Sequence, residues 1–152
     1  MSHRPSRILT ALIVVAMPLL VGACSKSSND ATMQSQNNTT GQEVKVTSVD
    51  LGKNVGADNK VTDKTDTFMP NDVIYASILT DGSSSNTILK ATWMFQDGQV
   101  VSQSERAITP NGEAATEFHI QKPDGLPAGK YKVVVSLNGS PVQTKEFEVK
   151  AS

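Results

Sequence analysis

The chain has 152 residues, and its 15 acidic side chains nearly balance 14 basic ones. Binding of a polyanion needs clustered Lys and Arg, so this balance argues against a nucleic-acid partner. The single cysteine excludes an internal disulfide. The length allows one domain of ordinary size, which must be held together by packing alone.

The N-terminus reads as an export signal. Residues 1–7 are basic, and residues 8–21 are almost wholly apolar, interrupted only by Thr10 and Pro18. A membrane-spanning helix needs ~20 apolar residues, whereas this shorter run has the length of a signal-peptide core. The sequence therefore predicts a signal peptide over residues 1–23.

The only cysteine, Cys24, lies directly after this run, in the tetrapeptide Val21-Gly22-Ala23-Cys24. The tetrapeptide resembles the lipobox of bacterial lipoproteins, and the resemblance implies that the Cys24 thiol accepts diacylglycerol. Acyl chains at ~0.8 kcal/mol per buried methylene would hold the protein on a membrane. An uncleaved anchor helix and an ordinary signal peptide cut nearby are the alternatives.

The residue after the cysteine bears on location. In Gram-negative lipoproteins, which this segment resembles, Ser25 in place of Asp favours sorting to the outer membrane. The expected location is thus the cell envelope, lipid-anchored to a membrane, with the outer membrane facing the periplasm favoured.

A polar segment, 24–42, follows and is rich in Ser, Asn, Gln and Thr. It has too few large apolar residues to bury, which predicts a disordered tether. As a flexible chain it would span roughly 20–25 Å. The glycosylation-like triplets around Asn37 and Asn38 are interpreted as part of this polar tract.

From Glu43 to Lys150 short apolar runs alternate with turn signals, and no amphipathic helix is apparent. This rhythm predicts an all-β domain over residues 43–150 with seven to eight strands. The expected strands are 44–51, 73–79, 88–95, 99–102, 114–120, 131–137 and a last one ending in Phe147 and Val149, with a short edge piece at Val61.

Two details of this domain resemble immunoglobulin-like and fibronectin-III-like modules. Trp93 lies mid-strand, where such folds place a central core tryptophan, and Tyr131 follows a corner containing Leu126. The cysteine pair of antibody domains is absent. The resemblance implies an Ig-like antiparallel β-sandwich with a binding or spacer role and no particular ligand.

The last hairpin contains a conflict of parity. A two-residue turn at Asn138-Gly139 would put Val142 on the same face as Val135. Phe147 then falls on the opposite face, so we expect a β-bulge between Gln143 and Glu146.

Candidate catalytic groups are few in the domain. Its one histidine, His119, is expected to point to solvent, and the serines at 83–85 read as a flexible loop. No Gly-x-Ser-x-Gly elbow or glycine-rich phosphate loop occurs. We therefore expect no enzyme and no cofactor.

Carboxylates gather in residues 58–72, where Asp58, Asp63, Asp66 and Asp72 occur with Lys60 and Lys64 between them. Calcium takes six to eight oxygen ligands, so a calcium-binding or small-ligand sensor is the alternative function. The spacing matches no EF-hand, and Asp also serves turns in polar loops.

The outer face of the central strands suggests an interaction surface. By parity Ile88, Thr92 and Met94 point outward, the Asp97-Gly98 hairpin sets Val101 opposite Met94, and Val134 joins them from a neighbouring strand. Such an apolar stripe is typical of an interface. The alternatives are that these are the isolated apolar residues found on any protein surface, and that loop 52–67 covers them.

These observations predict a lipid-anchored cell-envelope protein whose Ig-like domain is a non-catalytic binding or assembly module. Its partners would be the membrane, through Cys24, and an envelope protein docked on Ile88, Met94, Val101 and Val134. The tether would set the reach of the domain and raise its effective concentration near that partner.

Overall fold

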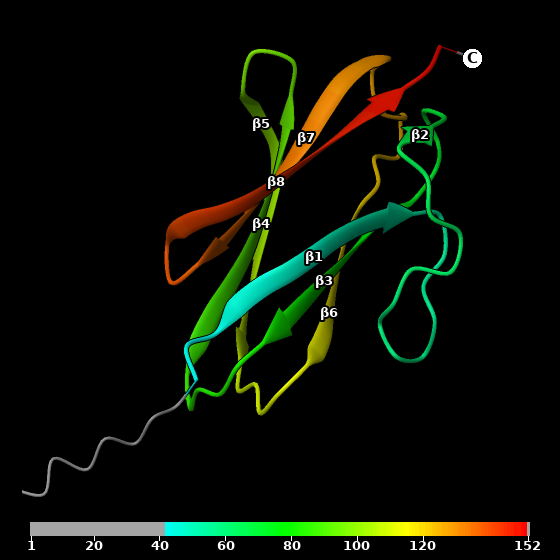
Figure 1. Cartoon of the computed structure of the whole chain (residues 1–152). Helices are drawn as coiled ribbons and strands as arrows, with labels where there is room; N and C mark the ends of the chain where they lie inside the picture. The colour runs from blue at the N-terminus through cyan, green and yellow to red at the C-terminus, as the bar shows by residue number, and fades with distance from the viewer. Residues whose placement is uncertain (1–41, 152) are drawn as a thin grey trace, which may run out of the picture. The chain divides into compact units, whose positions relative to one another are not determined.

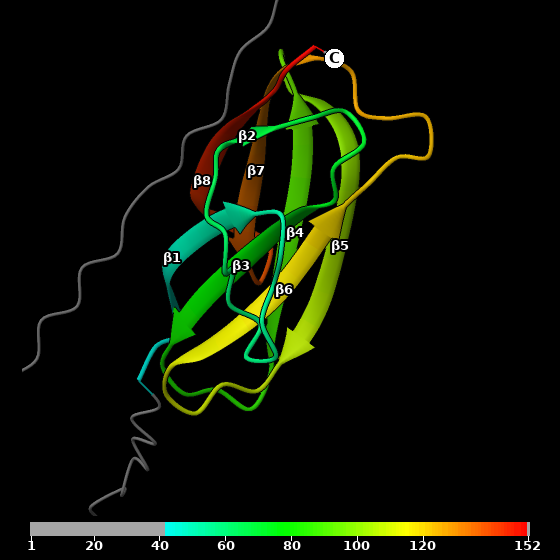
Figure 2. The ribbon, with the colours of Figure 1, turned by 90° about the vertical axis from the view of Figure 1, so that its right-hand side faces the viewer.

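The computed structural model describes residues 42–151, which form two β-sheets packed face to face (Figures 1 and 2). The predicted signal peptide 1–23, Cys24 and residues 25–41 lie outside this range. The strands are β1 (Lys45–Gly52), β2 (Thr67–Phe68), β3 (Ile74–Asp81), β4 (Thr87–Phe95), β5 (Gln99–Ile108), β6 (Ala114–Ile120), β7 (Gly129–Leu137) and β8 (Ser140–Val149).

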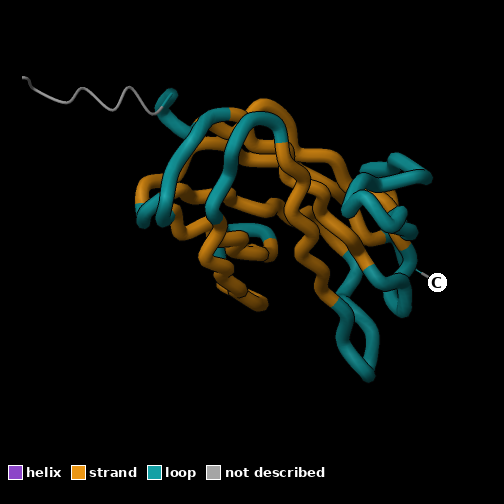
Figure 3. The backbone as a smooth tube through the Cα atoms, turned by 90° about the horizontal axis from the view of Figure 1, so that it is seen from below, coloured by secondary structure: helices purple, strands orange, loops and turns teal. Residues whose placement is uncertain are grey.

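The sheets have the orders β1-β3-β6 and β2-β8-β7-β4-β5. All pairings are antiparallel except that of β2 with β8. The part of the chain that the structure describes contains strands and loops but no helix (Figure 3). The prediction of an all-β Ig-like sandwich is therefore confirmed.

The core lies between the two sheets and consists of alternate residues from each long strand. Trp93 is fully buried and meets the ring of Phe147 edge-on at 5.9 Å between centroids. Phe147 also stacks on Tyr131 at 5.2 Å and contacts Phe68 at 5.7 Å. The inward parity predicted for β6 and β7 holds, except that Ala114 at the start of β6 is exposed.

The corner before β7 has the geometry expected of a tyrosine corner. The Tyr131 hydroxyl donates a 2.7 Å hydrogen bond to the carbonyl oxygen of Pro127, four residues upstream. Leu126 is buried beneath it, and burial raises the pKa of the Tyr131 hydroxyl. The phenol therefore stays a protonated donor and ties the loop to the core.

The expected edge piece at Val61 is not a strand. Val61 is buried but forms only an isolated bridge with Val55, and the short edge strand is β2. The pattern around β2 was too short to recognise, because its two residues alternate only once. It is held by Phe68 in the core and by the bond from the Glu148 amide to the Asp66 carbonyl.

The last hairpin contains a bulge, but not at the expected position. Ser136 pairs with Pro141 and Val135 with Gln143, which makes Val142 the extra residue. Val142 is 48% exposed rather than inward. Proline has no N–H to donate, so the strand accommodates its irregularity beside Pro141 instead of between Gln143 and Glu146.

The loop between β1 and β2 folds back over the outer face of the three-stranded sheet (Figure 2). The Ser77 hydroxyl donates 2.7 Å to the Asn59 carbonyl, and the Asn59 amide reaches the Ala115 carbonyl at 3.4 Å. The alternative that this loop covers Ile88, Thr92 and Met94 is thus wrong. It covers β3 and β6 because the chain turns back at Gly52, where a Cβ would collide with the Val61 side chain.

Candidate functional site

The outer face of the five-stranded sheet carries the residues predicted to form an interaction surface. Across β4, Ile88 pairs with Ala107, and Thr92 pairs with Val134 of β7. Met94 pairs with Lys132 of β7 and, on its other side, with β5. Ile88, Thr92, Met94 and Val134 are all partly exposed, as outward parity predicted.

The residue of β5 that faces Met94 is Val100, not Val101. The hairpin loop has three residues, since Phe95 pairs with Gln99, and a bulge between Trp93 and Met94 skips Val101. Val101 is half-buried and packs against the core, whereas Val100 is 52% exposed. A two-residue Asp97-Gly98 turn was assumed, and neither the longer loop nor the bulge has a marker in the sequence.

Ile88 is separated from the other members of the predicted surface. Lys90 lies between Ile88 and Thr92 on the same face and forms a 3.4 Å ion pair with Glu105 of β5. Thr92, Met94, Val100 and Val134 remain as neighbours on three adjacent strands, and we call them the apolar cluster. Sequence analysis missed Val100, the most exposed of the four.

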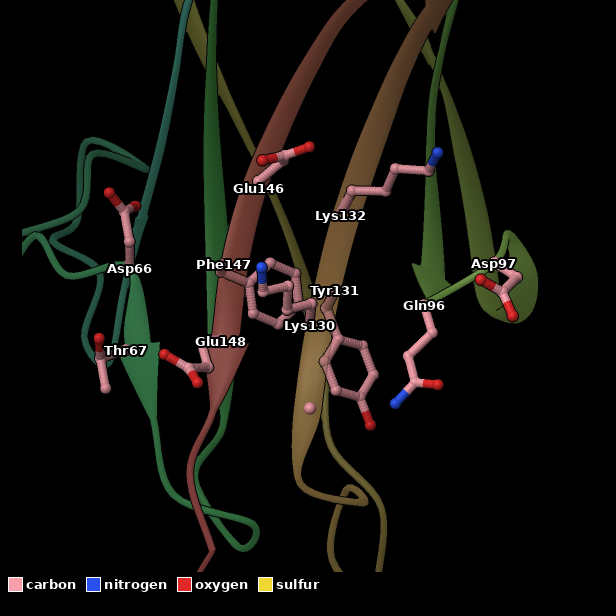
Figure 4. A pocket seen from close by; sticks show the side chains of 11 residues that line it. Asp66, Thr67, Gln96, Asp97, Lys130, Tyr131, Lys132, Glu146, Phe147 and Glu148 are labelled. Carbon is pink, nitrogen blue, oxygen red and sulfur yellow. The ribbon is translucent and has the colours of Figure 1, made fainter.

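A shallow depression of about 770 Å³ adjoins the apolar cluster near one end of the sheet (Figure 4). Lys130 and Lys132 of β7 face Glu146 and Glu148 of β8 across it, and Asp66, Asp97 and Gln96 complete the rim. Charges of both signs alternate here, so the depression resembles the polar rim of a protein interface more than a site for one ion.

The predicted calcium ligands do not converge. Each carboxylate has its own nearby partner: Asp58 the Lys60 amide at 3.2 Å, Asp63 the Asn54 side chain at 2.8 Å, Asp66 the Lys145 ammonium at 2.9 Å, and Asp72 the Lys53 ammonium at 2.7 Å. Within residues 42–151, no three acidic, His or Cys side chains come together as metal ligands. The carboxylates hold turns and ion pairs in the β1–β3 connection.

Asp72 shows what one of these carboxylates does. The Lys53 ammonium and then the Met69 amide, 2.7 Å from its carboxylate, hold the pKa of Asp72 below its usual value. The pair with Lys53 joins the end of β1 to the loop before β3. Its role is therefore to close a loop.

His119 lies on the surface of β6, as predicted. Its Nδ1 is 2.7 Å from Glu117 Oε1, and its ring packs 5.6 Å from that of Tyr75. Its side chain is 59% exposed. Among the predicted loop serines, Ser84 donates to the Asn86 carbonyl at 3.1 Å, which is turn chemistry.

No protein-family profile matches the chain, and no curated protein matches it by sequence. Among solved structures, an immunoglobulin-like protein from Pseudomonas aeruginosa is similar to it at 14% identity and a TM-score of 0.51, covering 73% of this chain and 99% of that one. At this identity the likeness shows the fold alone.

Two further structures are similar at lower scores. One is an alkylpurine DNA glycosylase from Pseudomonas fluorescens, at 14% identity and a TM-score of 0.45, with 72% of this chain and 31% of that chain covered. The other is a CARDB domain from Pyrococcus furiosus, at 11% identity and a TM-score of 0.44, covering 76% and 94%. This chain thus spans about a third of the glycosylase's length.

Proposed function

We propose that the chain is a lipid-anchored cell-envelope protein whose Ig-like domain is a non-catalytic module that docks an envelope protein partner on the apolar cluster. The observation that carries the docking role is a group of apolar side chains on a sheet face that residues 42–151 leave uncovered. The most exposed of these side chains is that of Val100, which is 52% exposed. Exposed apolar groups rimmed by charges are typical of interaction sites.

The position of the apolar cluster in the domain supports this role. The chain enters the sandwich at Gln42, whose carbonyl accepts a 2.8 Å hydrogen bond from the Ser83 amide in the loop before β4. Met94 and Val100 flank the β4–β5 hairpin, at the other end of β4 (Figure 1). A partner would therefore approach the apolar cluster at the end of β4 that lies away from Gln42.

Anchoring is the second part of the proposal and is supported by the lipobox-like tetrapeptide ending in Cys24. Within the described residues, no helix is long and apolar enough to cross a membrane. The polar composition of residues 24–42 predicts a tether of roughly 20–25 Å, which would give the domain reach without detaching it.

Docking is tested by charge placed in the apolar cluster of the full chain. The double variant Met94→Glu with Val100→Lys should have a free energy of unfolding within about 0.5 kcal/mol of the wild-type value, because both side chains point outward. It should lose the crosslinked partner in intact cells, since a charge buried in an interface is costly. Ala107→Glu, on the far side of the Lys90–Glu105 pair, is the control and should keep the partner.

Two outcomes would contradict docking at this site. Unfolding of the double variant would mean that these side chains belong to the core. A normal melt with unchanged crosslinks would place the partner on another surface.

The anchor is tested separately with Cys24→Ala, which should abolish incorporation of a labelled fatty acid. Ser25→Asp is the matched control and should keep the label while shifting the protein from the outer to the inner membrane. Labelling of the Cys24→Ala chain would show that the lipobox interpretation is wrong, whatever the docking experiment shows.

The calcium or small-ligand sensor remains without a supporting observation, because the carboxylates of residues 58–72 are directed to separate partners.

A further inference from the structure

The strand β5 forms an open edge of the five-stranded sheet. It has ten residues, pairs only with β4, and shows mostly exposed side chains. Among the described residues, its backbone receives no hydrogen bond from any loop. It contains neither proline nor lysine, and its one bulge, at Val101, leaves residues 102–108 regular.

The other three edges of the sandwich are short, irregular or partly occupied. The strand β2 has only two residues, and β1 begins with Lys45 and contains a bulge after Val46. On β6 the carbonyl of Ala115 already accepts a hydrogen bond from the side-chain amide of Asn59. The edge of β8 outside the two residues paired with β2 carries Pro141 and a bulge at Val142. Beyond its own bulge at Val101, β5 offers a regular edge over residues 102–108, and free N–H and C=O groups there favour the addition of another strand.

The sequence of β5 is complementary to itself in one antiparallel register. In an antiparallel pair related by a two-fold axis, opposite residues have their side chains on the same sheet face. Each possible register therefore has one residue that lies on the axis and faces its own copy, and this residue names the register. With Ser104 on the axis, Gln103 faces Glu105 and Ser102 faces Arg106 of the second copy. Beyond these pairs the bulge at Val101 shifts β5 by one residue, so Val100 and Ala107, which both point outward, come opposite each other.

The neighbouring registers are worse. With Gln103 on the axis, the same bulge brings Val100 opposite Glu105, so that an apolar side chain opposes a charge. With Glu105 on the axis, two glutamates oppose each other, which is destabilising. In the Ser104 register the two Glu105 side chains lie only on a diagonal, and each keeps its ion pair with Lys90.

Arg106 does not obstruct this edge. Its guanidinium lies 5.6 Å from the centre of the Phe118 ring, on the inner side of the sandwich. The Ser102 hydroxyl of a second copy can accept a hydrogen bond there.

From this edge and its register we propose that two copies of the chain associate through β5, antiparallel and centred on Ser104, into one continuous ten-stranded sheet. The two-fold axis is perpendicular to the sheet, so the apolar clusters of both copies lie on the same side. A single partner can therefore contact both clusters. The inference does not depend on the lipid anchor or on the docking proposal.

Disulfide trapping in the full chain tests the association. Ser104→Cys is a nearly isosteric change at an exposed position and puts two thiols opposite each other across the axis. Oppositely placed strand residues lie within the Cα separation that a disulfide requires. The expected result is a reducible dimer on the order of tenfold above that of Gln99→Cys, whose copies would lie ~33 Å apart, beyond disulfide reach.

The wild-type chain, with Cys24 as its only cysteine, sets the background. Fluorescence emission typical of a buried tryptophan, measured for Trp93, shows that each variant is folded. Equal trapping at Ser104 and Gln99, or trapping at Ser104 no greater than background, would overturn the proposal.

The register is tested with two differently tagged copies, one carrying Gln103→Cys and the other Glu105→Cys. The Ser104 register predicts mostly mixed dimers, because these two positions face each other. A predominance of dimers between two Gln103→Cys copies would show that the axis passes through Gln103 and that the assigned register is wrong.

Discussion

The two sheets of the sandwich differ in how their outer faces are treated. On the three-stranded sheet, Ser77 points outward and is nevertheless only 1% exposed, because the loop before β2 folds over it. On the five-stranded sheet the outward residues Thr92 and Met94 stay partly exposed and Val100 is 52% exposed. Among residues 42–151, a loop thus covers the outer face of one sheet, and the outer face of the other stays uncovered.

The same difference holds at the edges. The three-stranded sheet ends in β1, which is bulged, and in β6, whose backbone is bonded by the covering loop. The five-stranded sheet ends in the two-residue β2 and in β5, whose edge is open and regular beyond the bulge at Val101. We therefore expect substitutions on the covered sheet to affect folding, and substitutions on the outer face and edge of the other sheet to affect association. The four predictions below test this difference, from the largest expected effect to the smallest.

Trp93→Ala should lower the free energy of unfolding by about 3–5 kcal/mol, because it removes a fully buried aromatic side chain. Met94→Ala, the next residue and on the bare face, should change it by only about 0.5 kcal/mol. Urea denaturation followed by circular dichroism measures both. Similar losses for the two variants would mean that the bare face is part of the core.

Trp93→Phe adds a second control at the same position. Within the described residues, Nε1 of Trp93 has no hydrogen-bond partner, so phenylalanine removes no bond. This variant should be clearly more stable than Trp93→Ala.

Gly52→Ala should destabilise the covered sheet by about 1–3 kcal/mol, the usual cost of overpacking. The added methyl would collide with the Val61 side chain and the Asp63 backbone, so the covering loop must move. Gly56→Ala in the same loop is the control, since its methyl would crowd only the Asp58 side chain, at 2.8 Å, and would meet the Lys60 carbonyl and Thr62 at ordinary contact distances of 3.6 and 3.7 Å. Urea denaturation gives the stability, and limited proteolysis reports whether the loop opens. Uncut, fully stable Gly52→Ala protein would refute the close approach.

Ser77→Ala and Thr92→Ala compare outward hydroxyls on the two sheets. Ser77→Ala should cost about 1 kcal/mol, because it breaks the 2.7 Å bond to the Asn59 carbonyl in a buried position. Thr92→Ala, on the bare face, should stay within about 0.5 kcal/mol. Thermal melts of both variants measure the difference, and a larger loss for Thr92→Ala would reverse the assignment of covered and bare faces.

The ion pair of Asp72 should make a small, pH-dependent contribution of ~0.5–1 kcal/mol. Its pKa is lower in the folded chain than the ordinary 3.8, so the unfolded chain binds the proton first. The contribution is therefore complete above about pH 4 and is lost as the pH falls through the lowered folded pKa.

Asp72→Asn should remove this part of the acid destabilisation, as seen in urea midpoints measured between neutral and acidic pH. Lys53→Gln should weaken it, because Lys53 is the main cause of the lowered pKa. An Asp72→Asn chain with the wild-type pH dependence would contradict the assignment.

Much of the fold was predictable from the sequence because local patterns encode it. Alternating apolar residues placed Trp93, Val133 and Phe118 in the core, and the corner containing Leu126 placed Tyr131 at the start of a core strand. Asn138 and Gly139 both have positive φ, as a tight hairpin turn requires, so this turn was recognisable too.

The register of the strands and the choice of which sheet face the loop covers were decided only by the tertiary structure. A bulge shifts a strand by one residue without changing its composition, so Val100 replaced Val101 opposite Met94, and Val142 turned outward. Which face the loop after Gly52 covers depends on contacts between residues far apart in the chain, such as Asn59 with Ser77 and Ala115. The sequence alone determined the sandwich, its core and the lipobox-like position of Cys24. The bare sheet face and the open β5 edge follow from long-range packing, because exposure depends on what the rest of the chain leaves uncovered.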